Sequence, residues 1–379
     1  MNYIDLFAGV GGFRHGLTAA GHTCKGFVEI DKFARKSYKA IFNTEGEFEG
    51  HDITAISDDT IRGIGGIDII AGGFPCQAFS IAGKQGGFDD TRGTLFFEIM
   101  RFASILNPKY LFLENVQNIL HHNGGDTFET LLRAMAEVGY DAEWDCINSK
   151  TFVPQNRERV FIIGHLRGES TSKVFPLREN DAAINNKRIE KVGNIRQQGR
   201  SQSGDVVSIN GLAPTLCSTT TQKDPLKIVI PVMEPERIEK KQNGRRFKDA
   251  GEDMFTLTTQ ARHGIVVAEP LYIREATSKG FTEALPGDSV NISHPNSKTR
   301  RGRVGKKIAN TLMTGEEQAL VTDDFKIRKL TPRECWRLQG MPDWAFERAQ
   351  AVNSDSQLYK QAGNSVTVPV IEAIARQIL

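Results

Sequence analysis

The sequence predicts an α/β fold, in which a mostly parallel, doubly wound sheet is followed by a smaller, loop- and β-rich region. Up to about residue 166, short β-rich apolar runs alternate with amphipathic helical segments. After residue 167 the chain turns to Gly, Asn, Gln, Ser and Arg, with only short β runs. Because 379 residues exceed the usual size of a single core, a large domain and a smaller one are expected.

The elements of the large domain can be assigned from the N-terminus onward. "YIDLF" predicts the first strand, and residues 13–20 predict a helix that a glycine ends. "CKGFVEI" predicts the second strand. The helix expected over 31–42 begins with Asp31, whose side chain can accept a hydrogen bond from the first turn as an N-cap.

The second half of the large domain continues the alternation. A helix is expected over 126–138, because Asp126 and Glu129 have the spacing of a capping box and Gly139 can end the helix. The other expected elements are the strands "IDIIA" and "KYLFL", a helix over 94–106, and strands over 140–147 and 159–166.

A weak internal repeat runs through the second region. Residues 212–230, 254–267 and 308–321 each contain Thr-Leu, then polar residues, then a β-branched pair or a close equivalent. Each copy predicts a strand, an exposed loop and a second strand, although chance similarity among β-rich segments would give the same pattern.

Composition excludes several classes of protein. No apolar run approaches the roughly 20 residues that span a bilayer, and the N-terminus enters a strand pattern without a signal sequence, so a cytoplasmic protein is expected. The five cysteines form no CxxC pair, which argues against a zinc site or a disulfide framework. A net charge of +2 decides nothing about nucleic acid, because clustering of Lys and Arg matters more.

The glycine-rich stretch "DLFAGVGGF" at 5–13 predicts a ligand site between the first strand and the first helix. It lacks the last glycine of the dinucleotide fingerprint. Glu29 follows the second strand, where a carboxylate can hold a pair of ribose hydroxyls, and Asp52 can meet an adenine amino group. The pattern therefore favours an adenosine ligand without a pyrophosphate.

Cys76 lies in "GGFPCQAFS", directly after a buried strand and at the sheet edge where open α/β folds bind ligands. An isolated cysteine is usually an inert core residue, but this one follows Pro75 on a turn. The next segment, 77–93, contains four glycines and predicts a lid. A thiol beside a lid indicates covalent catalysis.

Further polar residues are expected at the same edge. Glu114 ends the strand "FLENV", and Gln155, Arg157 and Arg159 lead into the last strand, where the two arginines share a face. Taken alone, these residues could be a solvated strand end and a surface salt-bridge pair.

Together, these motifs resemble the bacterial and phage DNA (cytosine-5)-methyltransferases. The order is that of the family: "DLFAGVGG", "GGFPCQAFS", "FLENV", "QNRERVFIIG", "LTPRECWRLQGMPD" and "QAGNSVTVPV". The resemblance covers the chain outside residues 168–325. It implies a Rossmann-like, S-adenosylmethionine-dependent methyltransferase domain over 1–167, completed by 355–379, and a small target-recognition domain over 168–354.

The resemblance also implies the ligands. S-adenosylmethionine is the expected cofactor, S-adenosylhomocysteine its product, and no metal is expected. The C-terminal helix after "GNSV" is expected to pack beside the first strand. The implied cofactor-binding residues are Phe7, Ala8, Gly9, Gly11, Gly12, Glu29, Ile30, Asp52, Ile53, Pro75, Asn364, Ser365 and Val366.

The implied chemistry starts with attack of Cys76 on C6 of a cytosine flipped out of duplex DNA. Glu114 would hold the N3 and N4 edge and Arg159 the O2 side, with Gln155 and Arg157 in the same catalytic group. In the lid, Gln77, Ser80, Gln85 and Arg92 would contact DNA. A basic run over 298–307 is expected to face phosphates, with Lys298, Arg300, Arg301 and Arg303 as DNA-binding residues.

The expected partner is double-stranded DNA, bound by a monomer that contacts no membrane. A restriction endonuclease of the same site would act without direct contact. Three alternatives stay open at this point: methylation of transfer RNA, a catalytically silent DNA-binding protein, and a NAD- or FAD-linked oxidoreductase. The long variable region counts against a transfer RNA methyltransferase, and the intact set of Cys76, Glu114 and Arg159 counts against a silent DNA-binding protein. The missing third glycine counts against the oxidoreductase.

Overall fold

The structure is a computed structural model that describes most of both regions. Within each region some segments fall outside the description, including 76–94 and much of 178–270. The described residues are 1–75, 95–177, 191–194, 205–207, 228–233, 263–268, 271–295, 297, 299–315, 317–322 and 326–378.

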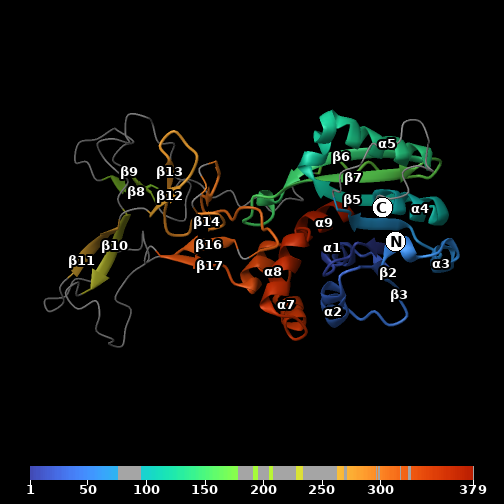
Figure 1. Ribbon diagram of the computed structural model, residues 1–379, viewed down its shortest axis with the longest axis horizontal. Helices are drawn as coiled ribbons and strands as arrows, with labels where there is room; N and C mark the ends of the chain where they lie inside the picture. The colour runs from blue at the N-terminus through green and yellow to red at the C-terminus, as the bar shows by residue number, and fades with distance from the viewer. Residues whose placement is uncertain are drawn as a thin grey trace.

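A seven-stranded sheet forms the large domain, in the order β3-β2-β1-β4-β5-β7-β6 (Figure 1). The first five strands of this order pair in parallel, whereas β7 is antiparallel to both β5 and β6. The prediction of a mostly parallel sheet is therefore confirmed. The strands are β1 (Asn2–Leu6), β2 (Thr23–Val28), β3 (Phe48–Gly50), β4 (Ile69–Gly73), β5 (Tyr110–Val116), β6 (Tyr140–Asn148) and β7 (Glu158–Leu166).

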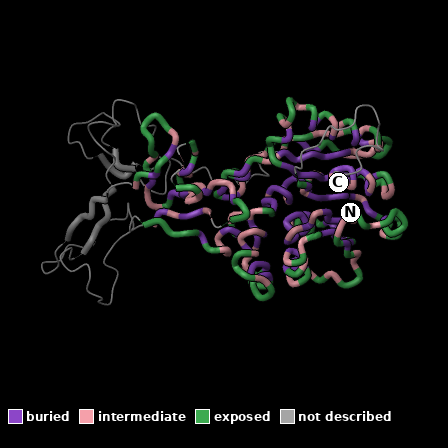
Figure 2. The backbone as a smooth tube through the Cα atoms, viewed as in Figure 1, coloured by how far each residue is buried: buried purple, intermediate pink, exposed green. Residues whose placement is uncertain are grey.

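Helices cover both faces of this sheet because neighbouring strand residues point to opposite sides. Tyr3 and Tyr110 pack with the helices of one face, and Ile4 and Leu111 with those of the other. Figure 2 shows the strands as the buried centre of the domain. The first face carries α1 (Gly12–Ala19) and α9 (Val368–Ala375); the second carries α3 (Asp58–Ile64), α4 (Leu95–Leu106) and α5 (Asp126–Glu137).

The C-terminal helix α9 completes the N-terminal half of the sheet. Ile371 and Ile374 pack in the same cluster as Tyr3, which confirms the expected return of the chain to β1. A Cβ on Gly16 of α1 would lie 2.6 Å from the Cβ of Ile371, so only a glycine allows the two helices to approach this closely.

A third cluster joins the C-terminal helices to the glycine turn and α2. Trp336 and Phe346 lie in this cluster together with Val10 and Ile41. The division of the chain into two domains stays a prediction, but this packing places residues on both sides of 354 in one core. The helices are α2 (Lys32–Ile41), α6 (Pro332–Leu338), α7 (Asp343–Gln350) and α8 (Asp355–Asn364).

The remaining described strands form small antiparallel sheets. Four of them make the order β15-β14-β16-β17, and the other six form pairs (Figure 1). They are β8 (Lys191–Asn194), β9 (Asp205–Val207), β10 (Ile228–Met233), β11 (His263–Ala268), β12 (Leu271–Arg274), β13 (Phe281–Ala284), β14 (Ser289–Asn291), β15 (Val304–Gly305), β16 (Gln318–Val321) and β17 (Ile327–Lys329).

Two local predictions are wrong. The helix α5 has Gly125 as its N-cap, and Asp126 is its first residue, so the capping box at Asp126 and Glu129 does not form. In the third Thr-Leu copy, only β16 is a strand; the Thr-Leu half forms an isolated bridge from Ala309 to Gln155 instead. The Thr-Leu halves of the first two copies lie outside the described residues. By contrast, the N-cap at Asp31 is confirmed, since its side chain accepts from two backbone N–H groups of α2.

Candidate active site

A cavity of about 430 Å³ opens at the carboxyl edge of the sheet. It is lined by the ends of β1, β2, β4 and β5 and by the last turn of α8. Predicted site residues on its wall are Phe7, Gly9, Glu29, Ile30, Asp52, Ile53, Pro75, Glu114, Arg157, Arg159 and Asn364. One cavity therefore brings together residues from both ends of the chain.

The glycine turn after β1 brings backbone close to a carboxylate. Phe7, Gly9 and Gly11 have φ values of 56°, 57° and 86°, the left-handed region that glycine adopts without strain. The N–H of Gly9 donates to Glu29 Oε2 at 2.7 Å, and the N–H of Asp31 donates to Oε1 at 2.7 Å. Glu29 is thus held at both oxygens, each of which can accept a further hydrogen bond.

Burial raises the pKa of Glu29, while the two N–H donors lower it. Asp52, which is half-buried, also lines the cavity and caps the short turn η1 (Ile53–Ala55), accepting from the N–H of Thr54 at 3.0 Å. Carboxylates at Glu29 and Asp52, with apolar Phe7 and Ile53 beside them, fit the hydroxyls, amino group and ring of an adenosine.

Glu114 and Arg159 form an ion pair in the same cavity. Arg159 Nε lies 3.0 Å from Glu114 Oε1, and both side chains are largely buried. Burial raises the pKa of Glu114, although Arg159 and Arg157 lower it. A carboxyl group whose protonated form is favoured by burial can donate a hydrogen bond to a bound base, beside a fixed cation.

This arrangement has a counterpart in known proteins. A family model described as C-5 cytosine-specific DNA methylase matches residues 1–379. The chain belongs to this family. The prediction of a cytosine-5 DNA methyltransferase is therefore confirmed, and methyl transfer within this family implies S-adenosylmethionine as the cofactor.

Individual relatives of the methylase are bacterial and phage proteins. The orphan methyltransferase M.SPRI of Bacillus phage SPR is 30% identical, covering 100% of this chain and 97% of that protein. The type II methyltransferase M.HpaII of Haemophilus parainfluenzae is 34% identical, with 100% and 88% covered. Among solved structures, the Dnmt2 methyltransferase of S. pombe has a TM-score of 0.52 at 15% identity, covering 99% of this chain and 97% of that one, and shares the fold.

Several predicted cofactor residues of the methylase lie behind the cavity wall. A Cβ on Gly12 would lie 2.8 Å from both Ser365 Oγ and Val366 Cγ2, so this glycine lets the "GNSV" turn pack against α1. Ala8, Gly11, Gly12, Ser365 and Val366 do not line the cavity in the described structure, and their contact with the cofactor stays a prediction. They shape the turns that do line it.

Arg157 lines the cavity and also makes structural contacts, and its catalytic role stays a prediction. Its guanidinium is buried and donates to the carbonyl oxygens of Leu312 at 3.4 Å, Gly363 at 3.3 Å and Ser365 at 2.7 Å. Burial lowers its pKa to about 10. Arg157 therefore joins the start of β7 to two distant segments. Gln155 is fully buried away from the cavity, and its carboxamide has no hydrogen-bond partner among the described residues.

The predicted nucleophile and most of the predicted DNA-contacting residues lie outside the described residues. They are Cys76, Gln77, Ser80, Gln85, Arg92 and Lys298. The residue before Cys76, Pro75, is on the cavity wall. Asn115 Nδ2 donates to the carbonyl of Phe74 at 2.9 Å, which fixes the chain that leads to Cys76.

The basic run of the small domain is only partly exposed. Arg301 is exposed, but Arg303 is buried and donates to the carbonyls of Asn291 and Arg274 at 2.9 Å. These hydrogen bonds join Arg303 to two neighbouring strand segments, and its contact with DNA stays a prediction. Arg300, which is partly buried, donates to Ser293 Oγ.

Sequence reasoning missed one contact on the cavity wall. Lys360 of α8 lies 2.6 Å from Asp31, the N-cap residue of α2, and both residues line the cavity. The pair joins positions 329 residues apart, so no local pattern could indicate it. In the described part of the chain, no helix has the length and apolar surface to cross a membrane, and no cluster of three or more His, Cys, Asp or Glu could hold a metal.

Proposed function

We propose that the methylase transfers its methyl group through a covalent adduct of Cys76 with a cytosine flipped out of duplex DNA. The observation that supports this is the continuous cavity, which runs from Glu29 and Asp52 to Glu114 and Arg159 and has Pro75 on its wall. Cofactor, base and the residue before the thiol thus share one space.

In the proposed mechanism, the Cys76 thiolate bonds to C6 of the base and moves an electron pair to C5. Protonated Glu114 donates to N3, where negative charge develops, and Arg159 holds the O2 side. The bound cofactor supplies, on a sulfonium, the methyl group that C5 takes up. Loss of the C5 proton and of the thiolate then restores the ring and free Cys76. This chemistry needs no metal, because thiolate and sulfonium already provide nucleophile and electrophile.

For the cofactor we assign ribose hydroxyls to Glu29 and the adenine amino group to Asp52. Phe7, Ile30 and Ile53 offer apolar surface for the adenine ring, and Asn364 also lines the cavity. S-adenosylhomocysteine would leave by the same opening.

The DNA part of the proposal concerns the small domain, taken as 168–354. It would read a short site, with Arg300 and Arg301 near phosphates and with lid residues 77–93 closing over the extrahelical base. A monomer in the cytoplasm suffices for one cytosine at a time. A restriction endonuclease of the same site would share only the DNA sequence.

The test uses DNA in which the target cytosine, located by bisulfite sequencing of plasmid, is replaced by 5-fluorocytosine. Fluorine cannot leave C5 as a proton does, so the adduct persists and can be seen on a denaturing gel. We expect trapping with duplex DNA and cofactor, and a loss of turnover of at least about 10³-fold in Cys76→Ser.

The matched control is Cys146→Ser, since Cys146 is an exposed thiol on β6 that does not line the cavity. It should behave like the unaltered methylase. Near-normal turnover of Cys76→Ser would remove Cys76 from the mechanism, and preferential methylation of transfer RNA would overturn the DNA substrate.

A further inference from the structure

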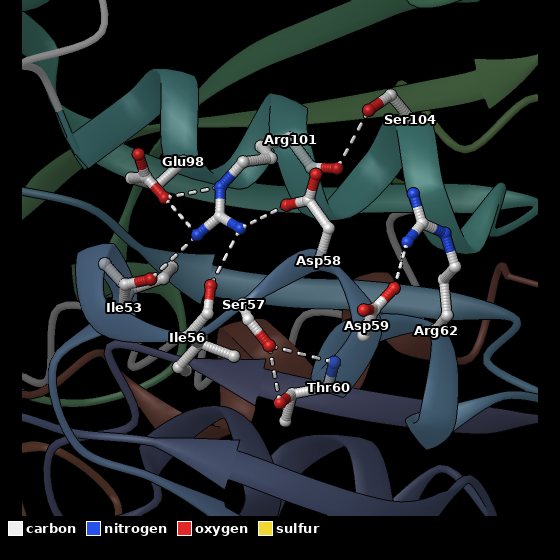
Figure 3. Close-up of polar contacts among 10 residues, drawn as sticks. All are labelled: Ile53, Ile56, Ser57, Asp58, Asp59, Thr60, Arg62, Glu98, Arg101 and Ser104. Carbon is white, nitrogen blue, oxygen red and sulfur yellow. Dashed lines mark hydrogen bonds and ion pairs between the residues drawn. The ribbon is translucent and has the colours of Figure 1, made fainter.

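Arg101, in the middle of α4, forms a network with the turn between β3 and α3 (Figure 3). Its Nη2 donates to the carbonyl of Ile53 at 3.0 Å, and its Nη1 to the carbonyl of Ile56 at 2.9 Å. Glu98 and Asp58 accept from the same guanidinium at 2.6 to 2.8 Å. One rigid, planar group therefore fixes two carbonyls three residues apart, which sets the curvature of the turn.

The turn held by Arg101 also carries part of the cavity wall. Asp52 and Ile53 both line the cavity. The side chain of Ile53 is buried in the same cluster as Phe97 and Met100 of α4, so α4 holds the turn by apolar as well as polar contacts.

A single peptide group links Arg101 to the carboxylate of Asp52. The carbonyl of the Ile53–Thr54 peptide accepts from Arg101, and the N–H of the same peptide donates to Asp52 Oδ1 at 3.0 Å. The hydroxyl of Thr54 donates to the same Oδ1 at 2.7 Å. Because a peptide is planar, fixing its oxygen also fixes the direction of its N–H, and with it the position of the carboxylate.

We propose that Arg101 is a positioning residue for cofactor recognition, which orients the Asp52 carboxylate toward the adenine 6-amino group through the Ile53–Thr54 peptide. This rests on the assignment of Asp52 to the adenine under "Proposed function". Arg101 itself does not touch the cofactor in this scheme, and no role in the methyl transfer step is assigned to it.

The test measures, by calorimetry, the dissociation constants of S-adenosylhomocysteine and of its analogue with hydrogen in place of the adenine 6-amino group. The unaltered methylase should prefer the amino compound by about tenfold, as expected for one hydrogen bond to a charged group. Arg101→Met should lose most of this preference, while its affinity for the analogue changes little.

Two further variants separate the possible outcomes. Arg62→Met is the matched control, because Arg62 pairs with Asp59 at 2.6 Å on the neighbouring helix α3 and should leave the preference intact (Figure 3). Arg101→Lys keeps a cation for Glu98 but lacks the fork that holds two carbonyls, so it should lose the preference too, and it serves if Arg101→Met does not fold.

Asp52→Ala, which removes the acceptor oxygens, tests the underlying assignment. If Asp52→Ala keeps the preference, the adenine contact of Asp52 fails, and the role of Arg101 with it. If Asp52→Ala abolishes the preference but Arg101→Lys and Arg101→Met keep it, only the role of Arg101 is overturned. Equal weakening of both ligands in the Arg101 variants would mean general support of the fold and would also overturn the proposal.

Discussion

At the scale of single residues, several carboxyl groups at and near the cavity are buried, and burial disfavours their ionised form. Asp5 of β1 is fully buried; its Oδ2 faces the hydroxyl of Tyr38 at 3.4 Å, and its Oδ1 has no hydrogen-bond partner among the described residues. Burial raises the pKa of Asp5 to about 8; the charge of Arg14 lowers it and that of Glu29 raises it. With this pKa, the buried Asp5 carboxyl is mostly protonated at neutral pH.

The substitution Asp5→Asn tests this assignment through stability. In the unfolded chain the pKa of Asp5 is near its ordinary value of 3.8, whereas in the folded chain it is about 8. Because the folded state holds the proton more tightly, the unaltered protein loses stability as the pH rises between these two values. The asparagine does not titrate. The free energy of unfolding of the variant, relative to that of the unaltered protein, should therefore increase by up to ~1.4 kcal/mol per pH unit across this window.

The measurement is the free energy of unfolding in urea from pH 5 to 8 for both proteins. Other titrating groups act equally in the two chains and cancel in the difference. Parallel stability profiles would show that Asp5 is already ionised in the folded state.

Residue types at strand ends could be predicted from the sequence, whereas their partners could not. Glu29 follows the buried strand β2 and Glu114 lies near the end of the buried strand β5, and parallel strands bring such ends to one edge. The burial of Arg303 and the links made by Arg157 depend on segments far away in the chain. From the local sequence, a basic run is expected to be a solvated face. Only tertiary packing decides that one of its residues, Arg303, is buried.

At the scale of elements, the last turn of α8 meets the third Thr-Leu segment without room for a side chain. A Cβ on Gly363 would lie 2.3 Å from the carbonyl oxygen of Met313 and 2.8 Å from the N–H nitrogen of Thr314. The next residue, Asn364, lines the cavity. Met313 and Thr314 therefore contact the cavity wall through backbone, which cannot move aside as a flexible side chain can.

We expect Gly363→Ala to push this segment and Asn364 apart. The substitution should cost about 1 to 3 kcal/mol of stability, the usual range for overpacking, and should weaken S-adenosylmethionine binding as well. Gly315→Ala is the control in the same segment, because its Cβ would meet only ordinary contacts from 3.5 Å upward. Thermal unfolding and calorimetric cofactor affinity for both variants give the comparison, and equal behaviour of the two would contradict it.

Helices with a clear repeat of apolar residues were predicted well from the sequence, whereas short elements were not. The helices over 31–42 and 94–106 agree with α2 and α4 within a residue, since apolar positions recur along their length. The seven-residue helix α3 was not predicted, because it is too short to show a period. The Thr-Leu half of 308–321 reads as β-rich, but its backbone pairs only at Ala309, with Gln155 of the large domain.

At the scale of the whole molecule, distant parts of the chain join at the cavity. Figure 1 shows α7 and α8 between the seven-stranded sheet and the strands β14, β16 and β17. Arg157 and Gly363 link the large domain to residues 312–314 at this junction. The fold class followed from local patterns, but this junction did not, because it is made by contacts between residues far apart in the chain: Gly363 lies 50 residues from Met313, and Arg157 lies 155 residues from Leu312.

The charge of the small domain leads to a prediction about DNA binding. Arg301 is exposed and uses its Nε for the carbonyl of Ala276 at 3.0 Å, which leaves its cationic head at the surface. A phosphate contact carries no sequence information and releases counterions. Arg301→Ala should therefore weaken binding equally to a duplex with the target sequence and to a scrambled duplex. It should also reduce the magnitude of the slope of log affinity against log salt concentration by roughly 1.

Arg303→Met should fail in a different way, because it leaves the carbonyls of Asn291 and Arg274 without their donor inside the small domain. We expect a loss of roughly 2 to 4 kcal/mol of stability rather than a simple change of salt slope. DNA affinity over a salt series on both duplexes, with thermal unfolding of each variant, separates the two arginines. The surface control is Arg376→Ala, at the exposed residue that follows α9. A changed methylation sequence in Arg301→Ala, or an unchanged slope, would show that Arg301 does not contact phosphate.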